Sequence, residues 1–210
     1  MKLLGKNFLL ILLCGLVLLE ALVIGLFYFQ LKTTRERITS YVEGLNFILR
    51  EGGGFRFAIA SDYINPEHYA IIHIAERMKT PEEIYEFCAH QVRYNPATTE
   101  SNLYDYYVLM ESRESNCAGH ANLLCSLLRA KGIKSEDCRV VYGSILKGGE
   151  RVNHAWVKLF WNNKWVVLDS TNFTPIRSFG AWSKEEFYRT FKVVPVFEYN
   201  DTFTNFRMIE

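Results

Sequence analysis

The sequence predicts an α+β domain in which a helix packs on an antiparallel sheet, preceded by an N-terminal transmembrane helix. A helical apolar pattern begins at Cys117 and ends before Gly132, and two strand-like runs follow at 152–161 and 164–171. A further run at 8–31 is almost wholly apolar. A chain of 210 residues, 49% of them hydrophobic, is long enough for one globular domain plus an appendage.

The apolar run at 8–31 is long enough to span a bilayer, which needs about 20 residues. Glu20 inside it costs about 3 kcal/mol, which the surrounding apolar residues should outweigh. A cleaved signal peptide with its core at 8–19 is the alternative, but no small-x-small cleavage site follows that core. We therefore expect residues 1–32 to form a short cytoplasmic tail and an uncleaved signal anchor. A short basic tail before a long C-terminal domain favours a domain outside the cytoplasm.

An amphipathic pattern follows the anchor and predicts a juxtamembrane helix that ends at the glycine run 52–54. Its apolar positions are Ile38, Tyr41, Val42, Leu45, Ile48 and Leu49. We expect this helix to pack on its own domain, with a partner helix as the alternative. Residues 33–54 then link the anchor to a folded domain at 55–210.

Two helices are predicted early in the folded domain. A cap at Asn65 predicts a helix over 66–78, and a capping box of Thr80 and Glu83 predicts a second over 81–94. The histidines on these helices follow no metal-ligand pattern and are interpreted as structural: His68, His73 and His90.

The segment 97–114 is predicted to be a loop that carries a tyrosine cluster: Tyr104, Tyr106 and Tyr107. These side chains could line a substrate cleft or simply pack over the site. Near the C-terminus, a second capping box predicts a short helix over 183–191, and the tail from Val193 suits an edge strand.

The helix after Asn116 places a cysteine where cysteines become reactive. Ala121, Leu124, Cys125 and Leu128 recur on one helical face, and Gly132 is a suitable C-terminal stop. Cys117 then lies in the first turn, where free N–H groups and the helix dipole favour a thiolate.

The two strand-like runs form a hairpin if Asn162-Asn163 is a two-residue turn. Trp161 then faces Lys164, Trp156 lies opposite Asp169, and His154 shares a sheet face with both Trp156 and Asp169. His154 and Asp169 become diagonal neighbours, whereas a turn longer by one residue would separate them. A thiol, a histidine and an orienting carboxylate are the groups used in nucleophilic acyl transfer.

These motifs resemble the transglutaminase-like superfamily of papain-type cysteine enzymes. The resemblance rests on 117–121 with its leucine-rich helix, 132–133, 140–143, 154–157, 165–171 and the helix end at 92–96. It implies a papain/transglutaminase-like core with the nucleophile at a helix N-terminus, and a catalytic domain at 55–210.

The resemblance implies that Cys117 attacks an amide carbonyl as a thiolate paired with protonated His154, while Asp169 orients the imidazole. The backbone N–H of Cys117 and one upstream group would hold the oxyanion, with Gln91, Tyr94 or the tyrosine cluster as the open alternatives. Trp156 is expected to pack beside His154. We expect hydrolysis of a peptide or protein, with transamidation or a non-catalytic binding domain as alternatives.

No cofactor, metal or nucleic acid is expected. The net charge of +1 and the lack of an arginine-rich run give no sign of nucleic-acid binding. A zinc set of Cys117, His120, Cys125 and Cys138 matches no familiar spacing, and His120 is better interpreted as packing beside the helix.

Cys88 and Cys125 fit core positions, and a disulfide among Cys88, Cys125 and Cys138 is left open.

Overall fold

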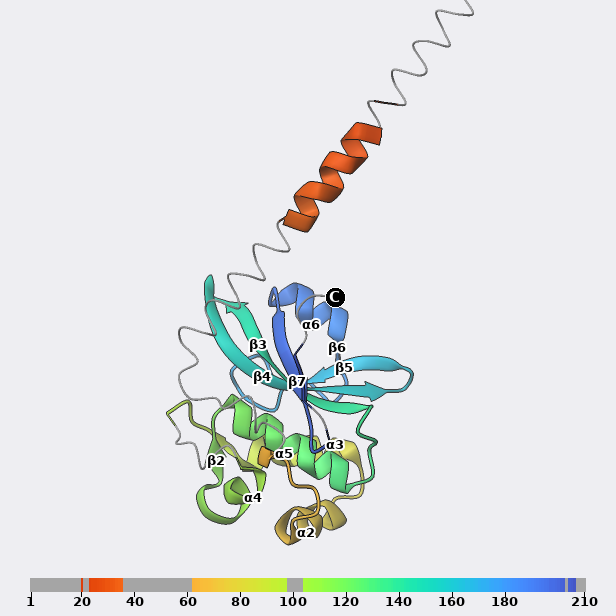
Figure 1. Cartoon of the computed structure of the whole chain (residues 1–210). Coiled ribbons are helices and arrows are strands. Elements are labelled where there is room, and N and C mark those ends of the chain that lie inside the picture. The colour runs from red at the N-terminus through yellow and green to blue at the C-terminus, as the bar shows by residue number, and fades with distance from the viewer. Residues whose placement is uncertain (1–19, 21–22, 36–61, 98–103, 203, 207–210) are drawn as a thin grey trace, which may run out of the picture. The chain divides into compact units, whose positions relative to one another are not determined.

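A computed structural model of the chain describes residues 20, 23–35, 62–97, 104–202 and 204–206 (Figure 1). The chain divides into two compact units, Met1–Glu43 and Gly44–Glu210. In the first unit, residues 23–35 are helical and their large apolar side chains are exposed, Ile24 to 69% and Tyr28 to 70%. Within the described ranges, no helix combines the length and the apolar character that a membrane crossing requires. Most of the expected anchor at 8–31, the expected helix at 38–49 and the glycine run 52–54 lie outside these ranges.

The second unit contains a six-stranded sheet in the order β6-β5-β4-β3-β7-β8. Every neighbouring pair in this sheet is antiparallel, as predicted. The strands are β3 (Cys138–Lys147), β4 (Glu150–Trp161), β5 (Lys164–Leu168), β6 (Trp182–Ser183), β7 (Val194–Tyr199) and β8 (Thr204–Phe206). The tail does supply an edge strand, β8, but β7 lies inside the sheet beside β3.

The β4–β5 hairpin has the predicted two-residue turn and register. Asn162 and Asn163 both have positive φ, 49° and 61°, as this tight turn requires, and Trp161 pairs with Lys164. The ladder ends at Val157 and Leu168, so Asp169 follows immediately after the last pair.

The remaining elements are helices and one small parallel ladder. The helices are α2 (Tyr69–Arg77), α3 (Pro81–Gln91), α4 (Asp105–Tyr107), the π-helix η3 (Val108–Ser112), α5 (Cys117–Ala130) and α6 (Lys184–Thr190). The ladder joins β1 (Arg93–Tyr94) to β2 (Glu114–Ser115), which brings the end of α3 beside the start of α5.

Two predicted segments differ from the structure. Residues 65–68 form a turn, in which the His68 N–H donates to the Asn65 carbonyl at 3.1 Å, so α2 begins only at Tyr69. The His68 side chain caps that helix by accepting from the Ala70 N–H at 3.3 Å. The predicted loop at 97–114 contains α4 and η3 instead, anchored by the buried Asp105, which accepts from Asn65 and from Ser126 of α5.

The sheet separates two apolar cores (Figure 1). On one face, α5 packs against residues such as Val140, Val157 and Leu168, while α2, α3 and α4 contact α5 from its other sides. On the opposite face, α6 packs with Trp156 and Val167. All residues from Ala118 to Leu128 are buried, so α5 is covered all round rather than on the one face that its sequence pattern indicates.

Candidate active site

Cys117 is the first residue of α5, at the position that the sequence predicts. The Asn116 side chain caps the helix by accepting from the N–H groups of Ala118 and Gly119, at 3.0 and 3.2 Å. Among the described residues, the N–H of Cys117 itself donates to no acceptor. The half-buried thiol therefore lies beside an N–H group available to a ligand, at the positive end of a 14-residue helix.

The other end of α5 also follows the prediction. Gly132 has φ +95°, and its N–H donates to Arg129 at 2.9 Å while the N–H of Ile133 donates to Leu128 at 3.1 Å. These two bonds form the Schellman motif that a glycine at this position favours. Both ends of the cysteine helix are thus fixed by local sequence.

His154 of β4 lies against Asp169, which follows β5. The imidazole Nε2 is 2.7 Å from Asp169 Oδ2, and both side chains are almost fully buried. The hairpin register accounts for this contact, because Asp169 follows the Val157–Leu168 pair and so reaches the level of Trp156, two residues from His154 on β4.

Two threonines that the sequence analysis did not single out complete the carboxylate site. Asp169 Oδ1 accepts from the N–H and the hydroxyl of Thr171, at 3.1 and 2.7 Å. Asp169 Oδ2 accepts from the hydroxyl of Thr174 at 2.5 Å. Behind them, the Tyr85 hydroxyl donates to the backbone carbonyls of Asp169 and Arg177 at 3.1 and 3.0 Å. The carboxylate is therefore held in one orientation by donors on both oxygens.

These contacts set the protonation of the pair. Burial by itself would lower the pKa of His154, but the charge and hydrogen bond of Asp169, together with Cys117, raise that pKa to about 10. Burial opposes ionisation of Asp169, yet His154, Thr174 and Thr171 leave its pKa below the ordinary value. At neutral pH the pair is an imidazolium and a carboxylate.

Nδ1, the second ring nitrogen of His154, is not used by Asp169. Nε2 is occupied by Asp169, and Nδ1 is buried with no hydrogen-bond partner among the described residues. Cys117 is among the groups that raise the pKa of the ring, so the thiol lies close to the imidazole. This arrangement can stabilise a thiolate next to an imidazolium.

Aromatic rings exclude water from His154. Trp156 lies beside it as expected, with ring centroids 6.0 Å apart, and packs in turn on Phe187 of α6 at 5.6 Å. Phe173 covers the imidazole more closely, at 4.8 Å, and Lys147 lies over the outer face of Phe173 at 4.0 Å. Phe173 follows Asp169 by four residues in an irregular segment, which offers no periodicity from which to predict this role.

Tyr94 and Gln91 lie near the site but in different positions. Burial, Cys117 and Asp169 raise the pKa of Tyr94 to about 12, so Tyr94 is close enough to respond to a thiolate. Gln91 is exposed at the end of α3, and both residues line a cavity of about 340 Å³. The rest of the cavity is lined by Ala89, His90, Val92, Arg93, Arg113, His120, Ser170 and Asn172.

The tyrosine cluster packs elsewhere. Tyr104 lies against Tyr63 with centroids 4.9 Å apart, and Tyr106 stacks on His68 at 4.5 Å. These contacts join α4 to the start of α2. The packing interpretation is therefore the one that the structure favours for these two rings.

Within the described ranges, the cysteines other than Cys117 are core residues. Cys88, Cys125 and Cys138 are buried free thiols, and the sulfurs of Cys125 and Cys138 lie 3.6 Å apart. Over the ranges that the structure describes, no group of three histidine, cysteine or acidic side chains is placed to hold a metal ion.

Comparison with known proteins agrees with the resemblance of the motifs. Residues 73–170 match the model of the transglutaminase-like superfamily, and this segment includes Cys117, His154 and Asp169. No curated protein matches the chain.

Solved structures with a related arrangement have low sequence identity. A Cytophaga hutchinsonii protein described as a candidate cysteine protease is 20% identical over 54% of this chain, with a TM-score of 0.43, and the match spans only 42% of its length. Legionella pneumophila LapG is 14% identical, with a TM-score of 0.47, over 65% of this chain and 85% of LapG. Calcium-bound LapG is 17% identical, with a TM-score of 0.45, over 67% of this chain and 76% of LapG. The family match covers 98 of the 210 residues, so the chain is similar to the transglutaminase-like superfamily over slightly less than half of its length.

Proposed function

We propose that this protein is a thiol-dependent amide hydrolase, a cysteine peptidase or amidase, in which Cys117, His154 and Asp169 form the catalytic triad. The observation that carries the proposal is the buried His154–Asp169 pair beside a cysteine at a capped helix N-terminus. Peptides or proteins are the proposed substrates.

In the first half of the reaction, the Cys117 thiolate attacks the amide carbonyl carbon and forms a C–S bond. The N–H of Cys117 stabilises the oxyanion, with Tyr94 as the second proposed donor because it is the candidate that responds to the thiolate charge. His154 then donates its Nδ1 proton to the amide nitrogen, the C–N bond breaks, and an amine leaves a thioester on Cys117.

In the second half, a water molecule attacks the thioester while neutral His154 accepts its proton at Nδ1. The C–S bond breaks, a carboxylic acid leaves, and the thiolate–imidazolium pair is restored. Asp169 keeps the imidazole oriented and stabilises its charge throughout. If a primary amine replaces water, the same thioester gives transamidation, which is the alternative outcome of these residues.

The test is the pH dependence of Cys117 alkylation by iodoacetamide in the full-length chain, read by peptide mass spectrometry. We expect the wild-type thiol to react well below pH 7 and the His154→Ala thiol to need higher pH. A Cys117 that titrates near the unperturbed value of about 8.5 in both proteins would refute the triad and favour a non-catalytic binding domain.

We further propose that residues 8–31 anchor the chain in a membrane with the domain outside the cytoplasm, on the basis of the apolar run alone. Extraction of cell membranes with alkaline carbonate tests the anchor: an anchored chain stays in the pellet. Protection of the C-terminal domain from external protease in spheroplasts would contradict the proposed orientation.

A further inference from the structure

We propose that the cavity beside Tyr94 and His120 is a substrate subsite that binds a carboxylate group. This inference rests on the proposed function, because it places the cavity next to the reacting bond. The occupant is an acidic group of a peptide substrate, either a side chain or the C-terminal carboxylate.

The cavity lies directly beside the proposed triad. Ser170 is the residue after Asp169, and His120 is one helical turn after Cys117, on the same side of α5. Tyr94 forms part of the wall and is close enough to Cys117 to respond to its charge. A peptide whose carbonyl lies at Cys117 can therefore place a neighbouring group in the cavity.

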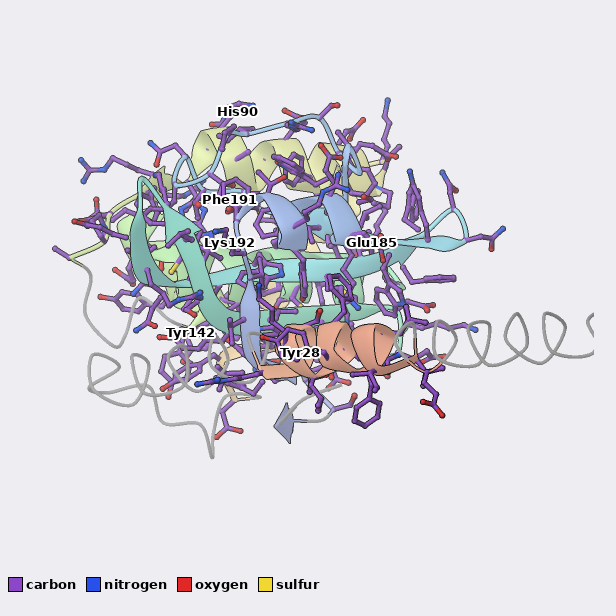
Figure 2. All side chains as sticks on the ribbon, turned by 90° about the horizontal axis from the view of Figure 1, so that it is seen from above. Tyr28, His90, Tyr142, Glu185, Phe191 and Lys192 are labelled. Atoms are coloured by element: carbon purple, nitrogen blue, oxygen red, sulfur yellow. The ribbon has the colours of Figure 1, made fainter. Side chains whose placement is uncertain are left out.

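The lining is rich in hydrogen-bond donors and contains no acidic side chain. Two guanidinium groups stand at the exposed edge, those of Arg93 and Arg113, and His90 lies at the periphery of the molecule close by (Figure 2). The carboxylate of Glu114 pairs with Arg93 but is not among the lining residues. Arg113 makes no ion pair with any described residue, so its positive charge is left for a ligand.

The backbone fixes the origin of the Arg113 side chain. Arg113 has φ 51°, its N–H donates to the Val108 carbonyl at 2.9 Å, and its own carbonyl accepts from the Arg93 N–H at 2.9 Å. Arg93 is thus the first residue of β1, and Arg113 immediately precedes β2 of the same small ladder, in which Arg93 pairs with Glu114. A fixed origin reduces the freedom that the side chain loses when it binds an anion.

The inner end of the cavity offers an unsatisfied polar atom. His120 is 1% exposed, its Nδ1 lies 3.5 Å from the Ser170 hydroxyl, and its Nε2 makes no hydrogen bond to a described residue. Burial is the largest influence on His120 and lowers its pKa, and the charge of His154 lowers that pKa further. The Arg93 carbonyl and Asp169 raise the pKa but do not reverse the effect of burial, so the ring is neutral near pH 7. In the tautomer whose Nδ1 accepts from Ser170, the proton lies on Nε2 and can be donated to a carboxylate oxygen.

The experiment compares chloroacetyl dipeptides as alkylating probes of Cys117 in the full-length protein. Chloroacetyl-Gly-Glu amide carries a side-chain carboxylate, chloroacetyl-Gly-Gln carries a terminal one, and chloroacetyl-Gly-Gln amide carries neither. The ratio of rate constants between an acidic probe and the neutral probe cancels any general change in thiol reactivity. We expect a ratio of about five, the most that one exposed ion pair usually gives, and a smaller ratio in high salt.

The variant is Arg113→Asn, since asparagine tolerates the positive φ, and the control is Arg189→Asn, an exposed arginine of α6. The ratio should fall to about one in Arg113→Asn, where the ion pair is lost, and remain unchanged in Arg189→Asn. A ratio near one in the wild type, or a ratio that survives Arg113→Asn, would overturn the subsite. Whichever acidic probe reacts faster identifies the source of the carboxylate.

A separate measurement distinguishes failure of the subsite from failure of the triad. Cys117→Ala protein is titrated with N-acetylglutamate amide and N-acetylglutamine amide while NMR follows the His120 imidazole. Preferential shifts with the glutamate compound would support the subsite even if Cys117 proved unreactive. Equal responses to both compounds would reject the subsite and leave the iodoacetamide test of the triad unaffected.

Discussion

Replacing Asp169 by asparagine tests the histidine pair most directly, because the two side chains have nearly the same shape. Asp169 uses both oxygens as hydrogen-bond acceptors. Oδ1 accepts from the N–H and the hydroxyl of Thr171, and Oδ2 accepts from the His154 ring and the Thr174 hydroxyl. The backbone N–H of Thr171 cannot change direction, so the asparagine oxygen must take the Oδ1 position.

The new amide NH₂ of Asp169→Asn then faces His154 Nε2. The Thr174 hydroxyl can rotate to accept from it, whereas the imidazole can accept only if its single proton moves to Nδ1. That is the wrong tautomer for the proposed reaction, since Nδ1 must accept the thiol proton. Without the carboxylate, burial dominates, and the pKa of His154 should fall from about 10 to below 6.5.

The expected loss in activity is on the order of 10³-fold, or about 4 kcal/mol of transition-state stabilisation. The assay is iodoacetamide alkylation of Cys117 between pH 5 and pH 10, with ¹⁵N NMR of the His154 ring to read its tautomer. The control is Asp201→Asn, whose carboxylate pairs with Arg129 away from the cysteine end of α5. Wild-type reactivity at pH 6 in Asp169→Asn would refute the role given to the carboxylate.

Three further changes test other parts of the structure. Thr174→Val removes one buried donor to Asp169, so the acid limb of the Cys117 pH profile should move to higher pH, with about 1–2 kcal/mol lost in urea unfolding. Gly143→Ala would place a Cβ in steric conflict with the Val194 carbonyl oxygen, so thermal unfolding should show a loss of stability of about 2 kcal/mol or more. An unchanged stability would mean that β7 shifts freely to make room. The raised pKa of His154 stabilises the folded protein fully below about pH 6.5, and this contribution is lost as the pH rises through about 10. The free energy of unfolding should therefore fall over this pH range in the wild type and fall less in His154→Ala.

The sequence predicts the β4–β5 hairpin well because its register depends on one local feature. Asn162-Asn163 tolerates positive φ at both turn positions, and a two-residue turn leaves only one pairing of the flanking residues. The same holds for α5, whose cap at Asn116 and stop at Gly132 are encoded within a few residues of its ends. The start of α2 is less well predicted, since Asn65 and Pro66 suit a turn as readily as a cap.

Contacts between distant segments could not be read from local patterns. Phe173 and Thr174 lie in an irregular segment, and their contacts with His154 and Asp169 exist only because 169–174 folds back beside β4. The cavity likewise needs α3, the β1–β2 ladder and residues 170–172 to meet. None of these segments has a periodicity that identifies the others as neighbours.

The two buried histidines near Cys117 show why burial alone does not assign a chemical role. His120 and His154 are both less than 2% exposed, and for both the largest single influence on the pKa is the loss of solvent, which favours the neutral ring. For His154 a directly bonded carboxylate reverses this preference, whereas His120 faces a serine hydroxyl and a backbone carbonyl, which are too weak to do so. One ring can therefore exchange a proton with a thiol as an imidazolium, and the other, one helical turn after Cys117, remains a neutral hydrogen-bonding group. The carboxylate partner, which the hairpin register positions, determines which of the two histidines is suited to acid–base chemistry.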